Sequence, residues 1–110
     1  SVTVRTSGQE TQIPICGLFV FIGTRPRTQV VKELLKTDPA GFILTGPDLM
    51  RDGKRPADWT ADRDPFPFET SVPGVFAAGD ARRGSEKRVA SAVGEGSAAV
   101  RLVHSYLETV

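Results

Sequence analysis

The chain has 110 residues, with 14 lysines and arginines against 13 aspartates and glutamates, and a formal net charge of +1. A chain of this length forms one small domain at most, and so balanced a charge gives no general attraction to nucleic acid or to an anionic membrane. No apolar run reaches the ~20 residues of a membrane-spanning helix, and a single cysteine excludes an internal disulfide and a cysteine-based metal site. We therefore expect a cytoplasmic protein without a nucleic-acid, membrane or metal partner.

Residues 1–15 predict a β-hairpin, because two runs of alternating apolar and polar residues flank the turn pair Ser7-Gly8. Pro14 cannot donate a hydrogen bond to a neighbouring strand, so the returning strand is expected at a sheet edge. Cys16 comes directly after the hairpin. We interpret it as a small buried hydrophobe rather than a redox thiol.

Residues 18–22 are apolar throughout and rich in β-branched and aromatic side chains, which predicts a central strand. In the polar loop that follows, Arg25 and Arg27 could contact a phosphate, although a solvated loop is the simpler interpretation. Residues 29–35 predict a short amphipathic helix, and residues 42–44 predict a short strand.

Residues 46–68 contain four prolines among mixed charges, which excludes a regular element. Loops of this length usually have a function or are mobile. We interpret this one as a surface insertion. Trp59 is expected to anchor the loop rather than to serve as a stacking platform.

A turn and a short strand are predicted next. Pro73-Gly74 is a turn pair, and the apolar residues 75–78 suit a strand that is covered on both faces. Gly79 removes the side chain where another backbone or a ligand must come close. Asp80 then places a carboxylate at the carboxyl end of the strand, which is where ligands bind in open α/β sheets.

The last part of the chain predicts a basic loop and a long helix. Apolar and small residues recur at steps of four and three, on one face of that helix: Val89, Val93, Gly96, Val100, Val103 and Leu107. Ser85 is the expected N-cap. Lys87 and Arg88 place positive charge at the positive end of the helix dipole, a conflict that a bound anion would resolve.

Two of these runs resemble a known family. The run TSVPGVFAAGD (residues 70–80) resembles the second FAD-binding motif of the pyridine nucleotide-disulfide oxidoreductases, and specifically the thioredoxin reductase branch. The run GLFVFIGTRPRT (residues 17–28) is similar to the segment where, in that family, the chain leaves the NADPH domain and re-enters the FAD domain. The two runs have the family's order and approximate spacing, and the resemblance covers nearly the whole chain.

The resemblance implies an α/β fold with two parts. Residues 1–16 would be a β-hairpin at the tail of the NADPH-binding domain, and residues 17–110 would be the C-terminal part of a Rossmann-like, three-layer FAD-binding domain. The family's glycine-rich phosphate loops and the Cys-x-x-Cys pair of thioredoxin reductases do not occur in these 110 residues. We therefore expect the chain to be the C-terminal segment of a larger enzyme and to be inactive alone.

The implied function is electron transfer from NADPH through FAD to a disulfide, with a thioredoxin-like protein or another disulfide as substrate and a homodimer as the full-length form. Two alternatives remain open from sequence: a ferredoxin:NADP reductase of the thioredoxin-reductase-like type, and a non-enzymatic flavin-binding regulatory module. NADH in place of NADPH is also open. The resemblance places no catalytic residue and no metal ligand in this chain.

The resemblance also implies five cofactor-binding residues. Asp80, preceded by Gly79, matches the aspartate that hydrogen-bonds a hydroxyl of the FAD ribityl chain. Lys87, Arg88 and Val89 take the place of an Arg-Gln-Ala run whose backbone amides reach the N1 and O2 edge of the flavin ring. The side chains depart from the family's pattern, so the implied role is that of the backbone at Arg88 and Val89. The positive end of the helix would favour the negative charge of a reduced flavin.

Overall fold

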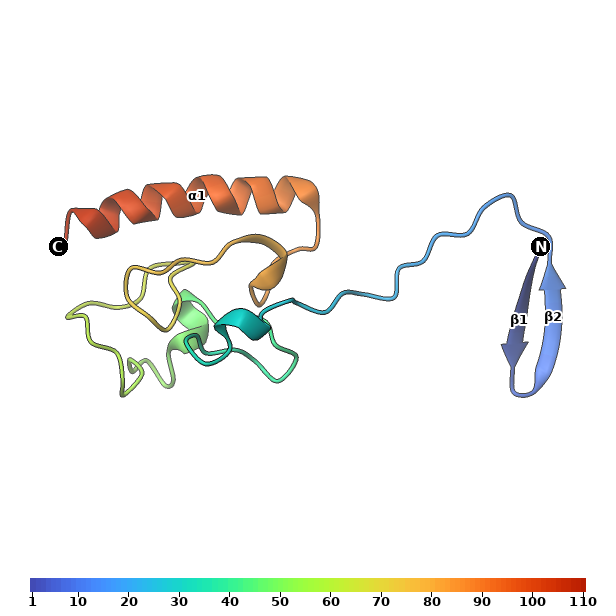
Figure 1. Ribbon diagram of the computed structural model, residues 1–110, viewed down its shortest axis with the longest axis horizontal. Helices are drawn as coiled ribbons and strands as arrows, with labels where there is room; N and C mark the ends of the chain where they lie inside the picture. Colours follow the sequence, from blue (N-terminus) through green and yellow to red (C-terminus); the bar gives the residue numbers. More distant parts are fainter.

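A computed structural model describes residues 1–110, which extend over 62 × 27 × 26 Å. The hairpin lies at one end, and a long extended segment joins it to a compact part in which the last helix lies along one side (Figure 1). The elements, in chain order, are strands β1 (Val2–Thr6) and β2 (Gln9–Ile13), 3-10 helices η1 (Gln29–Val31), η2 (Gly46–Leu49) and η3 (Gly79–Ala81), and helix α1 (Val89–Leu107).

The predicted hairpin is confirmed, with β1 and β2 paired antiparallel. Ser7 (φ 51°) and Gly8 (φ 84°) both adopt the left-handed conformation that a tight two-residue hairpin turn requires. Pro14 lies just beyond the end of β2 and therefore does not interrupt the ladder. The prediction for Cys16 is wrong: its side chain is exposed, because the residues around it pack against no other part of the chain.

The prediction of a strand at residues 18–22 is wrong for this chain. The segment is extended, but it pairs with no strand, and its five side chains are 64–91% exposed. A strand needs a neighbour to accept and donate its ladder hydrogen bonds, and the chain provides none beside this segment. The only sheet is the two-stranded hairpin, so the three-layer Rossmann-like arrangement stays a prediction.

The compact part is held together by isolated bridges instead of a sheet. Ile43 pairs antiparallel with Thr37 and parallel with Arg82, and Glu69 pairs antiparallel with Phe76. The strands predicted at residues 42–44 and 75–78 are therefore reduced to single bridges. Their backbones are extended, but a longer ladder would need neighbouring strands that these residues do not have.

The segments between the bridges are mostly irregular. The helix predicted over residues 29–35 contains one 3-10 turn, η1, followed by a non-helical turn. The irregular region 46–68 is confirmed except for η2, which has Pro47 in its first turn. The apolar core is small and consists of Leu35, Ile43, Leu49 and Ala99.

Helix α1 confirms the predicted long helix, but it begins at Val89 and not after Ser85. Arg88 has an extended backbone (φ −135°), and no side chain caps the helix. The N-cap prediction for Ser85 is wrong because the loop after η3 turns back on itself. The N–H of Ser85 donates to the carbonyl of Arg82, and the Ser85 hydroxyl donates to the carbonyl of Glu86.

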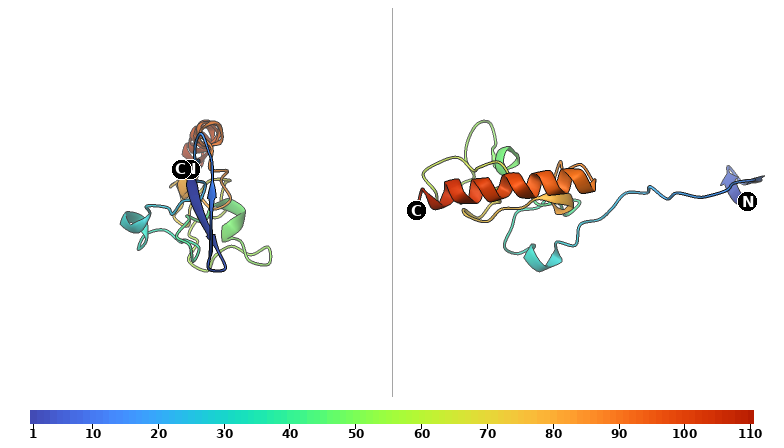
Figure 2. Two further views of the ribbon diagram at one scale, coloured as in Figure 1. Left: turned by 90° about the vertical axis from the view of Figure 1, so that its right-hand side faces the viewer. Right: turned by 90° about the horizontal axis from the view of Figure 1, so that it is seen from above.

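The apolar face of α1 is not the face that packs on this chain. Val89 is 84% exposed, and Val93 and Val100 are also exposed. The contacts come instead from a second face, which contains Ala92, Glu95, Ala99 and Tyr106. The left view of Figure 2 shows α1 end-on at the margin of the compact part, with no element beyond it. The apolar face is therefore uncovered.

Candidate functional site

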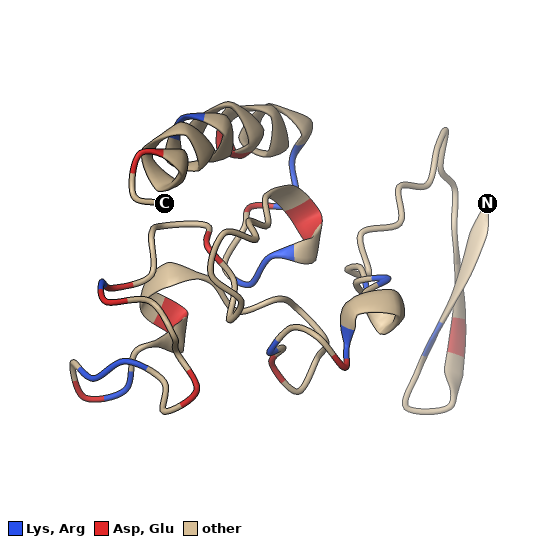
Figure 3. Cartoon of the chain, turned by 60° about the vertical axis from the view of Figure 1, so that its left-hand side comes forward, with Lys and Arg blue, Asp and Glu red and all other residues tan.

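All five predicted site residues line one open hollow of about 530 Å³ between η3 and the first turn of α1. We call it the η3–α1 hollow. Figure 3 shows the acidic position of η3 close to the basic connection that leads into α1. The hollow is lined by Ala78, Gly79, Asp80, Lys87, Arg88, Val89, Ala92 and Val93.

Gly79 allows η3 to approach α1 closely. It is buried and has φ +75°, a conformation that side-chain-bearing residues rarely adopt. A Cβ atom added there would lie 3.4 Å from the Cβ atom of Ala92. The predicted close approach is therefore present, and the approaching element is the last helix of the same chain.

Asp80 is the middle residue of η3, and its carboxylate is exposed and accepts no hydrogen bond within the chain. The turn that holds it is fixed by backbone hydrogen bonds. The N–H of Ile43 donates to the carbonyl of Ala81 at 2.9 Å, and the N–H of Arg82 donates to the carbonyl of Gly79 at 3.0 Å. A rigid turn thus presents a carboxylate whose acceptor capacity is unused.

The first turn of α1 supplies free donors to the same hollow. The backbone N–H of Val89 has no partner in the chain, as expected at a helix N-terminus. The N–H of Arg88 differs, because it donates to the carbonyl of Glu86 at 2.7 Å. Of the two backbone amides expected to meet a ligand, only that of Val89 is therefore available.

Lys87 is held by its own surroundings. Its Nζ atom donates to the carbonyl of Ser85 at 3.2 Å and lies 4.3 Å from the ring centroid of Phe42. A carbonyl and an aromatic face both favour a cation. For Lys87, the predicted charge conflict is therefore relieved within the chain, and no anion is required to explain where the lysine side chain lies.

The sequence did not reveal an ion pair that joins η3 to α1. Arg82 donates to Glu95 through Nη2 at 2.7 Å and through Nε at 3.1 Å, and the N–H of Gly79 donates to the same carboxylate at 2.7 Å. The hydrogen bonds from Arg82 lower the pKa of Glu95. Burial opposes this effect and the Gly79 N–H adds to it, so that the pKa is about 2. The sequence feature that could have indicated this ion pair is the position of Glu95, a charged residue between two glycines in a helix rich in small residues.

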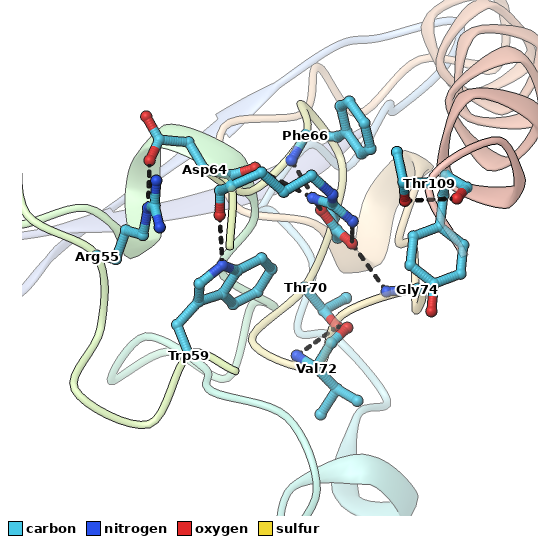
Figure 4. Close-up of polar contacts among 11 residues, drawn as sticks. Arg55, Trp59, Asp64, Phe66, Thr70, Val72, Gly74 and Thr109 are labelled. Carbon is cyan, nitrogen blue, oxygen red and sulfur yellow. Dashed lines mark hydrogen bonds and ion pairs between the residues drawn. The ribbon is translucent and has the colours of Figure 1, made fainter. Parts of the chain in front are cut away.

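A second buried ion pair lies at the other end of the compact part. The Glu69 side chain is 0% exposed and accepts hydrogen bonds from Arg63 at 2.7 and 2.8 Å, and from the N–H groups of Phe66 and Gly74 at 2.8 Å each. Figure 4 shows the Phe66 and Gly74 amides directed at this carboxylate. Burial alone would raise the pKa of Glu69, but these hydrogen bonds outweigh burial and lower it.

Arg63 also gathers aromatic side chains. Its guanidinium carbon lies 4.1 Å from the ring centroid of Phe66, 5.5 Å from that of Tyr106 and 5.9 Å from that of Trp59. The Trp59 Nε1 atom donates to the Arg63 carbonyl at 2.6 Å, which confirms the prediction that Trp59 anchors the irregular loop. This cluster therefore ties the loop and the end of α1 to the turn that opens the motif.

Comparison with known proteins decides the family. The family model described as pyridine nucleotide-disulphide oxidoreductase matches residues 1–96. The chain belongs to this family. Among its relatives, the thioredoxin reductase of Listeria monocytogenes is 30% identical over 101 residues, and thioredoxin reductase 1 of Saccharomyces cerevisiae is 32% identical over 102 residues. These matches cover 92% and 93% of this chain and 26% of each relative.

A solved structure agrees with this membership of the pyridine nucleotide-disulphide oxidoreductases. The crystal structure of thioredoxin reductase from Streptococcus pyogenes MGAS5005 is 34% identical and superposes with a TM-score of 0.63 over 94% of this chain and 28% of that one. The chain thus contains part of an α/β FAD- and NADPH-binding fold, and it spans about a quarter of the length of the curated relatives it matches.

Two further features of this pyridine nucleotide-disulphide oxidoreductase segment concern metal clusters and membrane spans. No group of three or more histidine, cysteine, aspartate or glutamate side chains is arranged to hold a metal ion. None of the helices has both the length and the apolar character needed to cross a membrane.

Proposed function

We propose that the longer protein containing this chain is a flavoenzyme that passes electrons from NADPH through FAD to a disulfide. Within it, the η3–α1 hollow would hold the ribityl chain and the N1–O2 edge of the flavin. The observation that carries the proposal is the meeting, in one hollow, of an unpartnered carboxylate and an unpartnered helix-terminal amide, those of Asp80 and Val89.

The residues present fit such a cofactor. The Asp80 carboxylate can accept hydrogen bonds from hydroxyl groups, and charge-assisted bonds of this kind are the stronger ones. The Val89 amide and the positive end of α1 suit an electron-rich ring edge. FAD supplies the electron chemistry when bound, whereas this chain's residues bind it, orient it and set the local field. The Arg88 amide does not take this role, because it already donates to the carbonyl of Glu86.

We further propose that residues 1–16 and 17–110 belong to two different domains of the longer protein. The long extended segment between the hairpin and the compact part supports this division. The exposed apolar residues 18–22 and the uncovered valines of α1 also support it, because soluble proteins rarely leave so much contiguous apolar surface open. The remaining part of a Rossmann-like FAD domain is the cover that we propose for both.

The disulfide acceptor, a thioredoxin-like protein, is proposed because thioredoxin reductases recur among the relatives. The homodimeric full-length form and the cytoplasmic location stay predictions. The chain alone is expected to be inactive, since the longer protein would contribute the glycine-rich loops for the FAD pyrophosphate and for NADPH.

The direct test uses the purified full-length protein. It should contain FAD at about one equivalent per chain and should oxidise NADPH when oxidised thioredoxin is added. If ferredoxin but not thioredoxin supports NADPH oxidation, ferredoxin is the electron acceptor and the proposed flavin site still stands. A protein without bound flavin, and without NADPH oxidation in the presence of added FAD, would contradict the proposal.

A further inference from the structure

The turn that presents Asp80 is fixed from two opposite sides. On one side, its backbone bonds to Ile43, which donates to the Ala81 carbonyl at 2.9 Å. On the other side, the Gly79 N–H donates to Glu95 of α1 at 2.7 Å. Asp80 lies between these two attachments, so they determine where its carboxylate stands relative to α1.

The attachment to α1 depends on a strong ion pair. The Arg82 and Glu95 side chains are only 16% and 13% exposed, and they share two hydrogen bonds in a fork-like arrangement. Such bidentate pairs fix geometry as well as adding energy. The guanidinium carbon of Arg82 also lies 4.9 Å from the ring centroid of Phe68, which further limits its movement.

This ion pair connects the two elements that build the η3–α1 hollow. Arg82 follows η3 directly, and Glu95 lies in the second turn of α1, one turn beyond Ala92, against which Gly79 packs. Neither charged side chain lines the hollow itself. A change in either residue would therefore alter the separation of Asp80 from the amide of Val89 without removing any ligand contact.

We propose that Arg82 and Glu95 are positioning residues, which fix the Asp80 carboxylate relative to the start of α1 and thereby set the affinity and midpoint potential of the bound flavin. This inference rests on the proposed flavin site. It assigns a cofactor-related role to two residues that would otherwise be counted as structural.

The chain offers a closely matched control. Glu69 is a buried carboxylate that, like Glu95, accepts two hydrogen bonds from one arginine and one from a glycine N–H, here from Arg63 and Gly74. Neither residue of that pair lines the η3–α1 hollow. Replacing Glu69 by Gln should therefore disturb the fold at least as strongly as replacing Glu95 by Gln, but near Tyr106, at the end of α1 away from the hollow.

The experiment compares Glu95→Gln and Glu69→Gln in the full-length holoprotein, together with Arg82→Lys and Arg63→Lys. The readouts are the FAD dissociation constant, the visible circular dichroism of the bound flavin, its midpoint potential and the thermal unfolding temperature. Because Asp80 would be displaced and its charge-assisted hydrogen bond to the ribityl chain weakened, the FAD dissociation constant should rise by up to about tenfold in Glu95→Gln, and by less in Arg82→Lys, which keeps the charge. Both variants should alter the flavin circular dichroism.

The inference is overturned if Glu95→Gln and Glu69→Gln change the flavin readouts equally at equal loss of unfolding temperature. Should either glutamine variant fail to fold, the two lysine variants decide the question in the same way. Asp80→Asn separates this inference from the proposed function. If Asp80→Asn weakens FAD binding but Glu95→Gln and Arg82→Lys do not, the positioning role fails alone, and if Asp80→Asn has no effect, the flavin site itself fails.

Discussion

The carboxylate of Glu95 accepts a hydrogen bond from the backbone N–H of Gly79 at 2.7 Å, across 16 residues of sequence. Gly79 is the residue that allows η3 to lie against α1, and Glu95 is the residue that keeps it there. The two elements of the candidate site are thus joined by one carboxylate, that of Glu95, which is only 13% exposed. The consequences for stability and for cofactor binding can be tested separately.

The Glu95 ion pair should make the protein sensitive to acid. Its pKa of about 2 in the folded chain lies below the ordinary 4.5, so the unfolded chain binds the proton more readily and acid favours unfolding. The stabilisation should be complete above pH ~4.5 and be lost as the pH falls towards 2. The difference in unfolding free energy between wild type and Glu95→Gln should shrink over this window, and a difference that stays constant down to pH 2 would contradict this.

Gly74 should tolerate substitution poorly. It has φ +82°, and a Cβ atom there would lie 2.6–2.8 Å from two ring carbons and the hydroxyl oxygen of Tyr106. Gly53 is a suitable control, because it has φ +71° but no atom within 4 Å of its added Cβ. Gly53→Ala should cost about 1 kcal/mol from backbone strain alone, whereas Gly74→Ala should cost about 2 kcal/mol more because it overpacks Tyr106. Equal thermal shifts for the two variants would show that Tyr106 does not constrain the turn.

The isolated 110-residue chain should be colourless and should self-associate. Phe19 and Phe21 belong to the exposed apolar segment that has no strand partner, and such segments pair with other chains. Replacing both by Asp should shift the light-scattering mass towards the monomer. Val30→Asp is the control, since Val30 is equally exposed but stands outside that segment. A monomeric wild-type chain, or a preparation that binds FAD at equal molar ratio, would be inconsistent with the proposed missing cover.

Lys87 and Arg88 together should influence the flavin potential in the full-length protein. Their positive charges lie beside the hollow and would favour an anionic reduced flavin. Replacing both by Gln should lower the midpoint potential by a few tens of millivolts, where ~30 mV corresponds to about 1.4 kcal/mol for a two-electron couple. Arg101→Gln, an exposed change farther along α1, serves as the control. An unchanged potential would leave only the Val89 backbone as a contact from this helix end.

The hairpin and α1 could be predicted because their signals are local. A turn pair between alternating residues forms a hairpin without outside help, and a helix satisfies its own backbone hydrogen bonds. The strands at 18–22 and 75–78 depend instead on neighbours that this chain does not contain. Composition predicted strands there, but without a neighbouring strand a ladder of hydrogen bonds could not form.

The sequence predicted which residues would lie near one another at the candidate site, but it did not predict the contacts that hold them there. The motif identified Asp80 and the start of α1, and the structure brings them to one hollow. The Arg82–Glu95 pair could not be predicted, because it depends on the path of the loop between η3 and α1. The spacing of apolar residues does not determine the path of such a loop. The same loop moved the helix start away from Ser85 and directed Lys87 onto Phe42.

The most direct test of the account is flavin retention by Asp80→Ala in the full-length protein, with Asp62→Ala as the control, because Asp62 is an exposed aspartate of the irregular loop. Removing charge-assisted hydrogen bonds worth roughly 1.5–3 kcal/mol should weaken FAD binding about ten- to hundredfold and leave the unfolding temperature of the apoprotein almost unchanged. Asp62→Ala should keep its flavin through gel filtration and dilution. If Asp80→Ala keeps its flavin as tightly as the wild type, the η3–α1 hollow does not hold the ribityl chain.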